Sequence, residues 1–476
     1  MKMKAIVIAF ILYPALLLAT IIPVATEPDL QDAVATLSSG DTLMLAAGTF
    51  DLTWTLWLDG GLDNVAIIGA GRDATIIQGP GMDVDDLDVP HLIWVGGIRH
   101  FYLADLTLRD VYYHPIQVST SDGAFAPHFD NLHIIDAGEQ FIKVSTAPGM
   151  VEYCDSGIVE NCVFEYTDRA RWWYTNGVDL LATGWWSIRD NLFLRIRGPE
   201  GELAGPTILA WQNSIYTTVE RNIFIECDIS VGMGNPGGPG AYARDGETTY
   251  DNQHAIVRNN FIYRAETGDV GISLNKANDA IVYHNTVVLN STFPWDIEYR
   301  YSSTYAHIFN NLCDSGILSR DGGAGDLDGN IITADESWFV NAPIGNLHII
   351  AGTDAQDAAV ALPVGEVADD IDGDTRPYST TADVGADEYI PGAFVRDISA
   401  ATTGERACLG YADGSLFWMG EIRPERIEIF DLTGRLKSSG PLETVLSRGS
   451  ELPTGIYLYR YSISGESFGG RIVVVR

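Results

Sequence analysis

Positive charge is scarce in this sequence. Its 476 residues include 29 lysines and arginines against 64 aspartates and glutamates, which gives a formal net charge of −35. Only five residues are lysine, and of these only Lys143 and Lys276 lie away from the two ends of the chain. A surface this acidic disfavours nucleic acids and anionic membranes as partners.

Cysteine is also rare, and common catalytic motifs are absent. Five cysteines are few and odd in number for a secreted chain, and the spacing of Cys154 and Cys162 matches no metal or redox motif. We therefore expect buried free thiols, with a Cys154–Cys162 disulfide as the alternative. The sequence contains no CxxC, HExxH or Walker motif, which removes the common metalloprotease and NTPase classes.

A long apolar run occurs only once, at the N-terminus. The first twenty residues, MKMKAIVIAFILYPALLLAT, place two lysines before an apolar stretch that ends in small residues. This pattern predicts a signal peptide over residues 1–26, cleaved between Thr20 and Thr26, with a membrane anchor as the alternative. We expect a protein that is secreted or held at the cell surface, with no stable membrane span after processing.

From residue 105 onward the sequence repeats. An Asx residue followed by alternating apolar positions recurs at intervals of 19 to 38 residues, at Asp105, Asn131, Asn161, Asn191, Asn222, Asn260, Asn285, Asn311 and Asn330. Alternation with a period of two predicts β-strands. The intervals are too short for propeller blades and lack the helical stretch of a leucine-rich repeat. The repeat therefore predicts an all-β fold, a right-handed parallel β-helix in which each interval is one coil and the recurring Asn side chains form a ladder.

The segment before the repeats resembles part of a known superfamily. LQDAVATLSSGDTLMLAAGTF resembles the entry segment of pectin-lyase-like β-helices, in which a short helix caps the open core, and NVAIIGAGRDATIIQG is similar to an early coil. The resemblance extends from about Leu30 to Tyr389 and implies the fold, not an activity. We expect the β-helix domain with its N-terminal cap to occupy residues 27–390.

The end of this domain is acidic. DDIDGDTRPYSTTADVGADEY resembles the closing segment that follows β-helices in exported bacterial proteins. Its Asp370, Asp372 and Asp374 are candidate calcium ligands, but Gly and Glu are missing at EF-hand spacing. A solvated acidic loop is the favoured interpretation.

The last part of the chain changes character. RIEIFDLTGRLKSSG and LPTGIYLYRYSISGESFGGRIVVVR alternate like strands broken by glycine turns, which predicts a small β-sandwich over residues 405–476 behind a linker at 391–404. This tail resembles the C-terminal sorting domain of type IX secretion cargo. The resemblance implies the secretion machinery as a partner, followed by release or surface attachment.

Each Asn-led strand is followed by a second strand, and stacking these by their apolar positions defines two outward columns. The first column contains Gln117, Lys143, Asp179, Leu209, Ser230, Ser273, Glu298 and Leu318. The second column contains Ser119, Ser145, Leu181, Trp211, Gly232, Asn275, Arg300 and Arg320. Lys143, which stands between apolar residues in EQFIKVSTAPG, is therefore expected to point outward and to pair with Asp179 one coil away.

Outward side chains and the loops beside them predict a face that binds polysaccharide. Long loops over a regular solenoid commonly carry binding residues, aromatic rings suit stacking on sugars, and Arg and Asp suit hydroxyl and carboxylate groups. For each tryptophan the alternative is that it covers the base of a loop. The candidate substrate-binding residues are Lys143, Asp179, Arg197, Trp172, Trp173, Trp211, Asn275 and Arg320.

The candidates fall into two clusters. The first cluster contains His114, Lys143, Asp179 and Arg197, and the second contains Asp269, Lys276, Glu298 and Arg300 with Asn275 and Arg320 alongside. Lys143 and Arg300 are five coils apart, roughly 24 Å at the spacing of paired strands, so they cannot share one reacting atom. A groove that holds several sugar units could engage both clusters.

The second cluster resembles the chondroitinase-B and alginate lyase family, in which a basic pair sits one coil apart beside acidic calcium ligands. Here Lys276 and Arg300 are 24 residues apart. The resemblance implies β-elimination of uronate-containing glycans, with Lys276, Glu298, Arg300 and Asp269 as catalytic residues and Ca²⁺ as a candidate cofactor. Two departures are Gly271, which stands where a second acid is expected, and the position of Lys276 at a turn.

Two other functions stay open. A glycoside hydrolase needs two carboxyl groups across one cleft, but Asp179 and Glu298 are four coils apart, so this class is less favoured. A non-catalytic surface protein that binds glycans or acts as an adhesin fits the same face, with Glu298 and Arg300 as a surface ion pair. We expect a monomer, and the sequence does not establish whether the protein catalyses a reaction.

Overall fold

The computed structural model describes residues 20–363, 365 and 367–391, and in the tail residues 408–412, 415–419, 426–431, 436–447, 452, 455–463 and 466–474. Residues 1–19 of the predicted signal peptide and residues 392–404 of the predicted linker lie outside this description. The first strand, β1 (Ile21–Val24), falls within the predicted leader.

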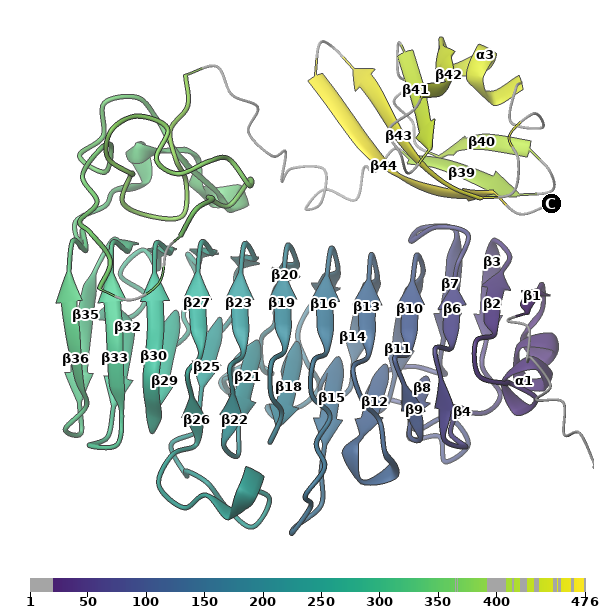
Figure 1. Ribbon diagram of the computed structural model, residues 1–476, viewed down its shortest axis with the longest axis horizontal. Coiled ribbons are helices and arrows are strands. Elements are labelled where there is room, and N and C mark those ends of the chain that lie inside the picture. The colour runs from purple at the N-terminus through teal and green to yellow at the C-terminus, as the bar shows by residue number, and fades with distance from the viewer. Residues whose placement is uncertain are drawn as a thin grey trace, which may run out of the picture.

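Three parallel sheets, A, B and C, run along the β-helix (Figure 1). In each coil the chain passes from sheet A to sheet B to sheet C, and each strand pairs in parallel with the strand at the same position in the next coil. This arrangement confirms the predicted right-handed parallel β-helix.

Sheet A has fourteen strands. Ten of them in coil order are β1, β2 (Thr42–Leu45), β6 (Ala66–Ile68), β10 (Tyr102–Ala104), β13 (His128–Asp130), β16 (Ile158–Glu160), β19 (Ser187–Arg189), β23 (Thr218–Glu220), β27 (Ile256–Arg258) and β30 (Ala277–Tyr283). The others are β33 (Tyr305–Phe309) and β36 (Ala324–Asp328), together with the short β26 (Asn252–Gln253), which pairs with β30, and β22 (Ser214–Ile215), which pairs with β26.

Sheets B and C have ten strands each. Sheet B contains β3 (Gly48–Asp51), β7 (Thr75–Gln78), β11 (Thr107–Val111), β14 (His133–Ala137), β17 (Val163–Glu165), β20 (Leu192–Leu194), β24 (Ile223–Ile225), β28 (Phe261–Tyr263), β31 (Thr286–Val288) and β34 (Leu312–Cys313). Sheet C contains β4 (Leu56–Leu58), β8 (Ile93–Val95), β12 (Ile116–Ser119), β15 (Ile142–Ser145), β18 (Val178–Leu181), β21 (Ile208–Trp211), β25 (Val231–Met233), β29 (Ile272–Asn275), β32 (Trp295–Arg300) and β35 (Gly316–Arg320).

The remaining elements are short. The first helix is α1 (Glu27–Ala35), β5 (Leu62–Asp63) pairs with β9 (Ile98–Arg99), and β37 (Phe339–Asn341) pairs with β38 (Asn346–Ile349). Single 3₁₀ turns are η1 (Thr120–Asp122), η2 (Arg244–Gly246), η3 (Glu336–Trp338) and η4 (Ala342–Ile344).

The tail contains the predicted strands. β39 (Cys408–Ala412) pairs with β40 (Ser415–Met419), and a four-stranded antiparallel sheet contains β41 (Arg426–Asp431), β42 (Leu436–Gly440), β43 (Gly455–Ile463) and β44 (Glu466–Val474), accompanied by helix α3 (Leu442–Ser447). Its assignment as a sorting domain remains a proposal.

Helix α1 covers the N-terminal end of the core, as the entry segment predicted (Figure 1). Thr26 is its N-cap and accepts a hydrogen bond from the Asp29 backbone N–H, which satisfies one of the free donors of the first turn. Leu30 is fully buried in the main hydrophobic core. Burial of one apolar helical face therefore closes the solenoid at this end.

An asparagine ladder joins successive coils, as predicted. The Nδ2 atom of each ladder residue donates to the Oδ1 atom of the next over 2.9–3.1 Å, through Asn191, Asn222, Asn260, Asn285, Asn311 and Asn330. Each Oδ1 also accepts the backbone N–H of the preceding ladder residue. The ladder therefore satisfies buried backbone and amide groups together.

The predicted start of this ladder was wrong by one position. Asp105, Asn131 and Asn161 occupy the residue before the ladder position and have φ between 52° and 59°. Val163 pairs with Leu192, so Cys162 is the counterpart of Asn191, and its backbone N–H donates to the Asn191 Oδ1. Asn and Asp tolerate the left-handed conformation, which explains why Asx residues appear at both positions.

The four cysteines whose side chains the structure describes are buried and unpaired, at Cys154, Cys162, Cys227 and Cys313. This confirms the expected free thiols for these residues and excludes the Cys154–Cys162 disulfide. The side chain of Cys408 lies outside the described part.

Sheet B is covered on its outer face from β17 to β34. Apolar residues of that face pack in a second core cluster with the segment that follows the last coil, through Phe339, Leu347, Ile349, Val384 and Ala386. Sheets A and C are not covered by this cluster, so their outward side chains are the places to look for a binding site.

Candidate functional site

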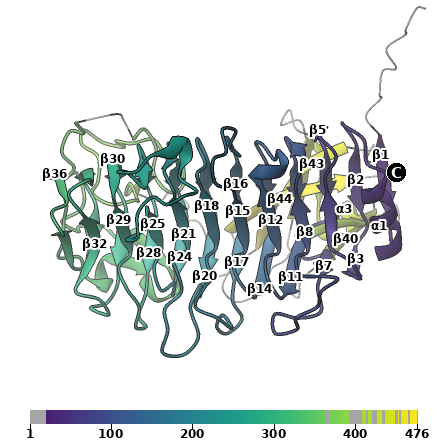
Figure 2. The ribbon, with the colours of Figure 1, turned by 90° about the horizontal axis from the view of Figure 1, so that it is seen from below.

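The outward face of sheet C is the candidate functional site. Figure 2 shows the strands of this sheet from β8 to β32 side by side. The register confirms that Gln117, Lys143 and Asp179 lie on neighbouring strands at one level. It also confirms Asn275 and Arg300 as partners, with Arg300 next to Arg320.

The predicted column was wrong at β25. Leu209 pairs with Gly232, and Gly232 pairs with Ser273, so Ser230 is not part of the column and the strand is displaced by two residues. The Asp228 carboxylate accepts hydrogen bonds from the backbone N–H groups of residues 198 and 204, which holds residues 228–230 in the turn. An alignment of apolar positions cannot predict a turn that is held by side-chain hydrogen bonds.

Lys143 points outward from sheet C but is buried, with 7% of its surface exposed. Its Nζ atom donates to the Asp179 carboxylate and, over 3.3 Å, to the Tyr174 hydroxyl. Burial works to lower the pKa of Lys143, but the charge of Asp179 and the contact with Tyr174 outweigh it and raise the pKa. Lys143 is therefore a charge-neutralised cation and not a free base.

Asp179 is tied to a second substrate-binding candidate. Trp211 Nε1 donates to Asp179 Oδ1 over 2.7 Å, and Asp179 is 1% exposed. The structure thus brings Lys143, Asp179 and Trp211 together. Removing one charge from such a pair leaves the other buried without a partner, which is costly, so we expect the loss of Lys143 or Asp179 alone to destabilise the middle of the face.

Arg197 lies apart from that trio in contacts of its own. Its guanidinium donates to Asp228 over 3.2 Å, to Glu266 over 2.9 Å and to the Thr267 carbonyl over 2.6 Å, and the residue is buried. These bonds fasten neighbouring turns between sheets B and C. The geometry gives Arg197 a structural role.

A histidine pair beside Lys143 was found only in part from the sequence. The rings of His91 and His114 stack with centroids 5.1 Å apart, and His114 Nε2 lies 3.7 Å from the Glu139 carboxylate. Burial, followed by the charges of His91 and Lys143, holds the pKa of His114 well below its usual range, and burial lowers the pKa of His91 to about 4. Burial also raises the pKa of Glu139.

Both imidazoles are therefore neutral at physiological pH. Because His114 Nδ1 lies 3.2 Å from the Gln140 carbonyl, which can only accept, this nitrogen carries the proton. His91 and Glu139 sit in turns without strand periodicity, so no sequence pattern marked them as neighbours.

Two tryptophans extend the outward column toward the N-terminus. Trp57 on β4 pairs with Trp94 on β8, their ring centroids are 4.9 Å apart, and Trp94 pairs with Gln117. Trp57 is exposed and Trp94 is half-buried. The alternation of residues in TLWLDG and LIWVGG matches that of the later strands, so it could have identified Trp57 and Trp94 as outward residues of the same column.

The predicted aromatic loop borders the same face. Trp172 and Trp173 are exposed and contact each other edge to face at 5.5 Å. The next residue, Tyr174, turns inward with its ring centroid 5.5 Å from Lys143 Nζ. The loop therefore closes over Lys143 and presents two indole rings to solvent.

The second cluster centres on Glu298, which is 4% exposed. Its carboxylate accepts hydrogen bonds from Ser273 over 3.0 Å, from Trp295 Nε1 over 3.2 Å and from Arg320 over 2.6 Å. Arg300 lies 3.9 Å away from the same carboxylate. A buried acid thus anchors two arginines.

Those arginines remain accessible. The side chains of Arg300 and Arg320 are 20% and 35% exposed, and Arg320 lies 5.1 Å from the Trp295 ring centroid. Arg300 also pairs with Asp321 over 2.7 Å. Asn275, beside Arg300, donates to Ser273 and has a buried Oδ1 without a hydrogen-bond partner.

Lys276 lies at the end of β29, in the left-handed region with φ of 51°. Its Nζ atom is 5.3 Å from the Tyr301 ring centroid, and Arg300 lies 5.0 Å from the same ring. The structure therefore brings Lys276 and Arg300 to one aromatic residue.

Asp269 lies at the opposite edge of sheet C from Lys276. Seven residues separate them, roughly 23 Å of extended chain. Burial raises the pKa of Asp269, and the charges of Glu298 and Arg320 act on it. The four predicted catalytic residues thus span the width of the strand and do not converge on one point.

The predicted calcium ligands in the closing segment have structural partners. Asp370 accepts backbone N–H bonds from residues 372, 374 and 388 over 2.8–3.1 Å. Asp372 contacts His348 Nε2 over 2.9 Å, and Asp387 lies close to both. This acidic loop is folded around its own donors, whereas solvation was the expectation.

Carboxyl groups of this closing segment predict an unusual pH dependence. Burial raises the pKa of Asp387 to about 7. Burial works to lower the pKa of His348, but the hydrogen bond to Asp372 and the charges of the neighbouring aspartates together outweigh it and raise that pKa. Each group holds its proton more tightly when folded, so its stabilisation is complete at low pH and is lost as the pH rises through the folded pKa. We expect the free energy that stabilises the folded segment to fall by about 2–3 kcal/mol between pH 5 and pH 8.

Hydrogen exchange checks this expectation. Amides of residues 346–349 should show lower protection at pH 8 than at pH 5 after correction for the intrinsic exchange rate, while those of residues 272–275 in sheet C should not change. Equal or greater protection of residues 346–349 at pH 8 would show that these groups do not couple to stability.

Within the described residues, no helix combines the length and apolar character that crossing a membrane requires.

No protein-family model and no curated protein matches the chain. Solved structures with a similar fold include an alginate lyase from Paenibacillus sp. str. FPU-7, with 14% identity, a TM-score of 0.36, and coverage of 65% of this chain and 99% of that one. The pectate lyase Pel9A has 11% identity and a TM-score of 0.44, over 78% and 97% of the two chains. The PL6 family polysaccharide lyase Pedsa3628 from Pseudopedobacter saltans has 12% identity and a TM-score of 0.34, over 66% and 94%. The chain thus has a distant structural similarity to polysaccharide lyases.

Proposed function

We propose that this is a secreted protein that binds a uronate-containing polysaccharide along the outward face of sheet C and cleaves it by β-elimination. The observation that supports the proposal is the arrangement of charges around Glu298. Its carboxylate is buried, while the guanidinium groups of Arg300 and Arg320 beside it remain accessible. A chain with a net charge of −35 repels a polyanion unless cations are fixed where it binds.

The proposed chemistry uses these cations to stabilise charge on the substrate. Arg300 and Arg320 bind the uronate carboxylate, whose charge otherwise opposes removal of the neighbouring C5 proton. A base removes that proton, the C4–C5 double bond forms, the C4–O bond breaks, and the leaving oxygen takes up a proton. Lys276 is the candidate for the proton transfer, because it shares the Tyr301 ring with Arg300.

Calcium does not fit this cluster. Glu298 is a single buried carboxylate that faces the guanidinium groups of both Arg300 and Arg320, so a bound dication would lie against two cations with one buried anion to offset them. We therefore derive no step through a metal ion here.

Binding without cleavage is the second candidate function. The tryptophans of the face favour it, because Trp57, Trp172 and Trp173 offer exposed ring surfaces for sugar stacking at a distance from the arginines. On this proposal the protein is a surface glycan-binding or adhesive β-helix.

One assay separates the two. Purified protein is incubated with uronate polymers of several types, with and without EDTA, while the absorbance of unsaturated products and polymer binding are followed. Product formation that EDTA leaves unchanged supports the lyase. Tight binding without product supports the second function, and neither binding nor product across the panel would contradict both.

Export is part of the same proposal. It rests on the leader at residues 1–26 and on the likeness of residues 405–476 to sorting domains. Because β1 (Ile21–Val24) pairs with β2, cleavage beside Thr20 would leave the first coil intact, whereas cleavage at Thr26 would remove its first strand.

A further inference from the structure

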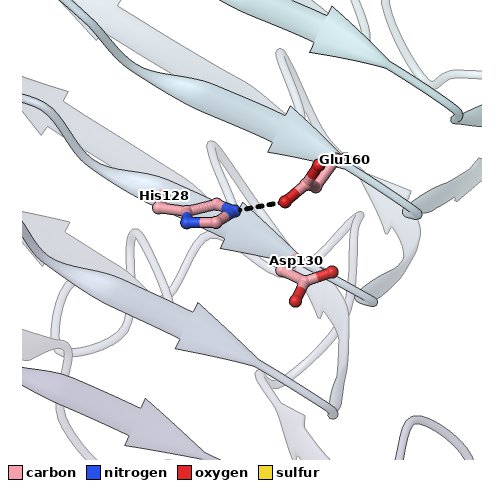
Figure 3. Close-up of side chains that lie close together, drawn as sticks. All are labelled: His128, Asp130 and Glu160. Atoms are coloured by element: carbon pink, nitrogen blue, oxygen red, sulfur yellow. Dashed lines mark hydrogen bonds and ion pairs between the residues drawn. The ribbon is translucent and has the colours of Figure 1, made fainter. Parts of the chain in front are cut away.

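A mixed nitrogen and oxygen cluster lies on the outward face of sheet A, away from the proposed polysaccharide face (Figure 3). His128 and Asp130 are two residues apart on β13, so their side chains leave the same face of the sheet. Glu160 on β16 pairs with Asp130 in the next coil. One ligand atom from each of the three residues lies within 4.8 Å of the other two.

We propose that His128, Asp130 and Glu160 bind a divalent transition-metal ion of the zinc type. Zn²⁺ binds imidazole nitrogen and carboxylate oxygen at about 2.0–2.2 Å, which brings neighbouring ligand atoms to roughly 3–3.5 Å. His128 Nε2 and Glu160 Oε1 are already 2.8 Å apart. Calcium and magnesium prefer all-oxygen sites, so a histidine in the cluster favours a transition metal.

Neighbouring side chains orient the two carboxylates. Tyr102 donates to Asp130 Oδ2 over 2.8 Å, and Asn161 donates to Asp130 Oδ1 over 3.0 Å. Arg189 contacts Glu160 Oε2 over 2.6 Å and leaves Oε1 toward His128. Each carboxylate oxygen has a second lone pair, so these bonds support coordination without excluding it.

The histidine ring is also held in place. The rings of Tyr102 and His128 meet edge to face with centroids 5.0 Å apart. The side chains of His128 and Glu160 are 30% and 18% exposed, so the cluster opens to solvent and an ion can enter with water as a further ligand. All three ligands stand on paired strands, which limits how far the site can distort.

Coordination requires an ionised Glu160 carboxylate and a neutral His128 imidazole. Binding would replace the His128–Glu160 hydrogen bond by two metal–ligand bonds, and the His128 ring would then carry its proton on Nδ1 while Nε2 binds the ion.

Sheet B provides a matched control. His133 and Glu165 form the same contact over 3.1 Å, and Arg195 contacts Glu165 over 2.6 Å, as Arg189 contacts Glu160. Within the described residues, no third ligand completes a metal-binding group there. The two sites differ in the carboxylate that Asp130 supplies.

Titration of the full-length protein with Co²⁺, followed by visible absorption and competed with Zn²⁺, tests the proposal. At 150 mM NaCl the wild type should show a saturable band from coordinated Co²⁺ that Zn²⁺ displaces. Asp130→Asn and His128→Ala should each weaken binding by at least about tenfold, and His133→Ala should leave it unchanged. Circular dichroism of each variant checks that the fold is retained.

The buried group His348, Asp372 and Asp387 could add a second bound ion, so the deciding quantity is the difference between wild type and variant. Absence of a band, a band unaffected by Asp130→Asn, or an equal loss with His133→Ala would overturn the proposal. Because these residues lie on sheet A, the result does not depend on whether sheet C binds polysaccharide.

Discussion

Replacing Asn260 by leucine should lower the free energy of unfolding by about 3–5 kcal/mol, because several buried polar groups lose their partners at once. The Asn260 Oδ1 accepts both the backbone N–H and the side-chain amide of Asn222. Its Nδ2 donates to the Val219 and Arg258 carbonyls and to Asn285. Urea denaturation followed by circular dichroism measures the loss.

Asn161→Gly is the control for the ladder variant. Asn161 is exposed and has φ of 56°, and its side chain donates a part-buried hydrogen bond to Asp130, so glycine keeps the backbone conformation and removes a bond outside the ladder. We expect this change to cost less than about 1 kcal/mol. Similar losses for both variants would show that the ladder does not stabilise the solenoid beyond an ordinary surface asparagine.

The double substitution Arg300→Ala with Arg320→Ala should weaken binding of a uronate oligosaccharide by about a hundredfold or more. Each hydrogen bond from a guanidinium to a carboxylate contributes about 1.5–3 kcal/mol, and the variant removes both donors. Including Glu298→Gln in the variant avoids leaving a buried carboxylate unpaired. Isothermal titration calorimetry measures the change.

A cation on another sheet controls for net charge. Arg258 on β27 pairs with Glu220 over 2.6 Å, much as Arg320 pairs with Glu298, but it lies on sheet A. Arg258→Ala should leave oligosaccharide affinity within about twofold, since long-range charge effects are screened at physiological salt. A comparable loss in this variant would mean that overall charge, rather than the site, controls binding.

The architecture could be predicted from the sequence because the solenoid repeats one local pattern. Alternation of apolar residues and recurring Asx residues identified strands and coils, and the pairing of Lys143 with Asp179 followed from the register. Where two neighbouring positions tolerate the same residue type, the pattern was ambiguous: Asn161 occupies the left-handed turn position, while Asn191 belongs to the ladder.

The site could be predicted only in part, since turns bring its residues together. His91 and Glu139 contact His114 from turns whose geometry no periodicity encodes, and Asp228 displaces β25 by holding a turn in place. The burial of Lys143 could not be predicted from the sequence either. This outward lysine is buried because the Trp172–Tyr174 loop closes over it. The positions of charged residues in the sequence therefore predicted the face. They did not predict which of its cationic side chains are accessible to a ligand.

The most direct measurement of the central claim is a crystal structure of the protein soaked with a uronate hexasaccharide. We predict density for the sugar chain along the outward face of sheet C, with one carboxylate bound by Arg300 and Arg320 and a sugar ring stacked on an exposed tryptophan of that face. Density on another face, or an empty sheet C at a concentration that saturates binding in solution, would contradict this account.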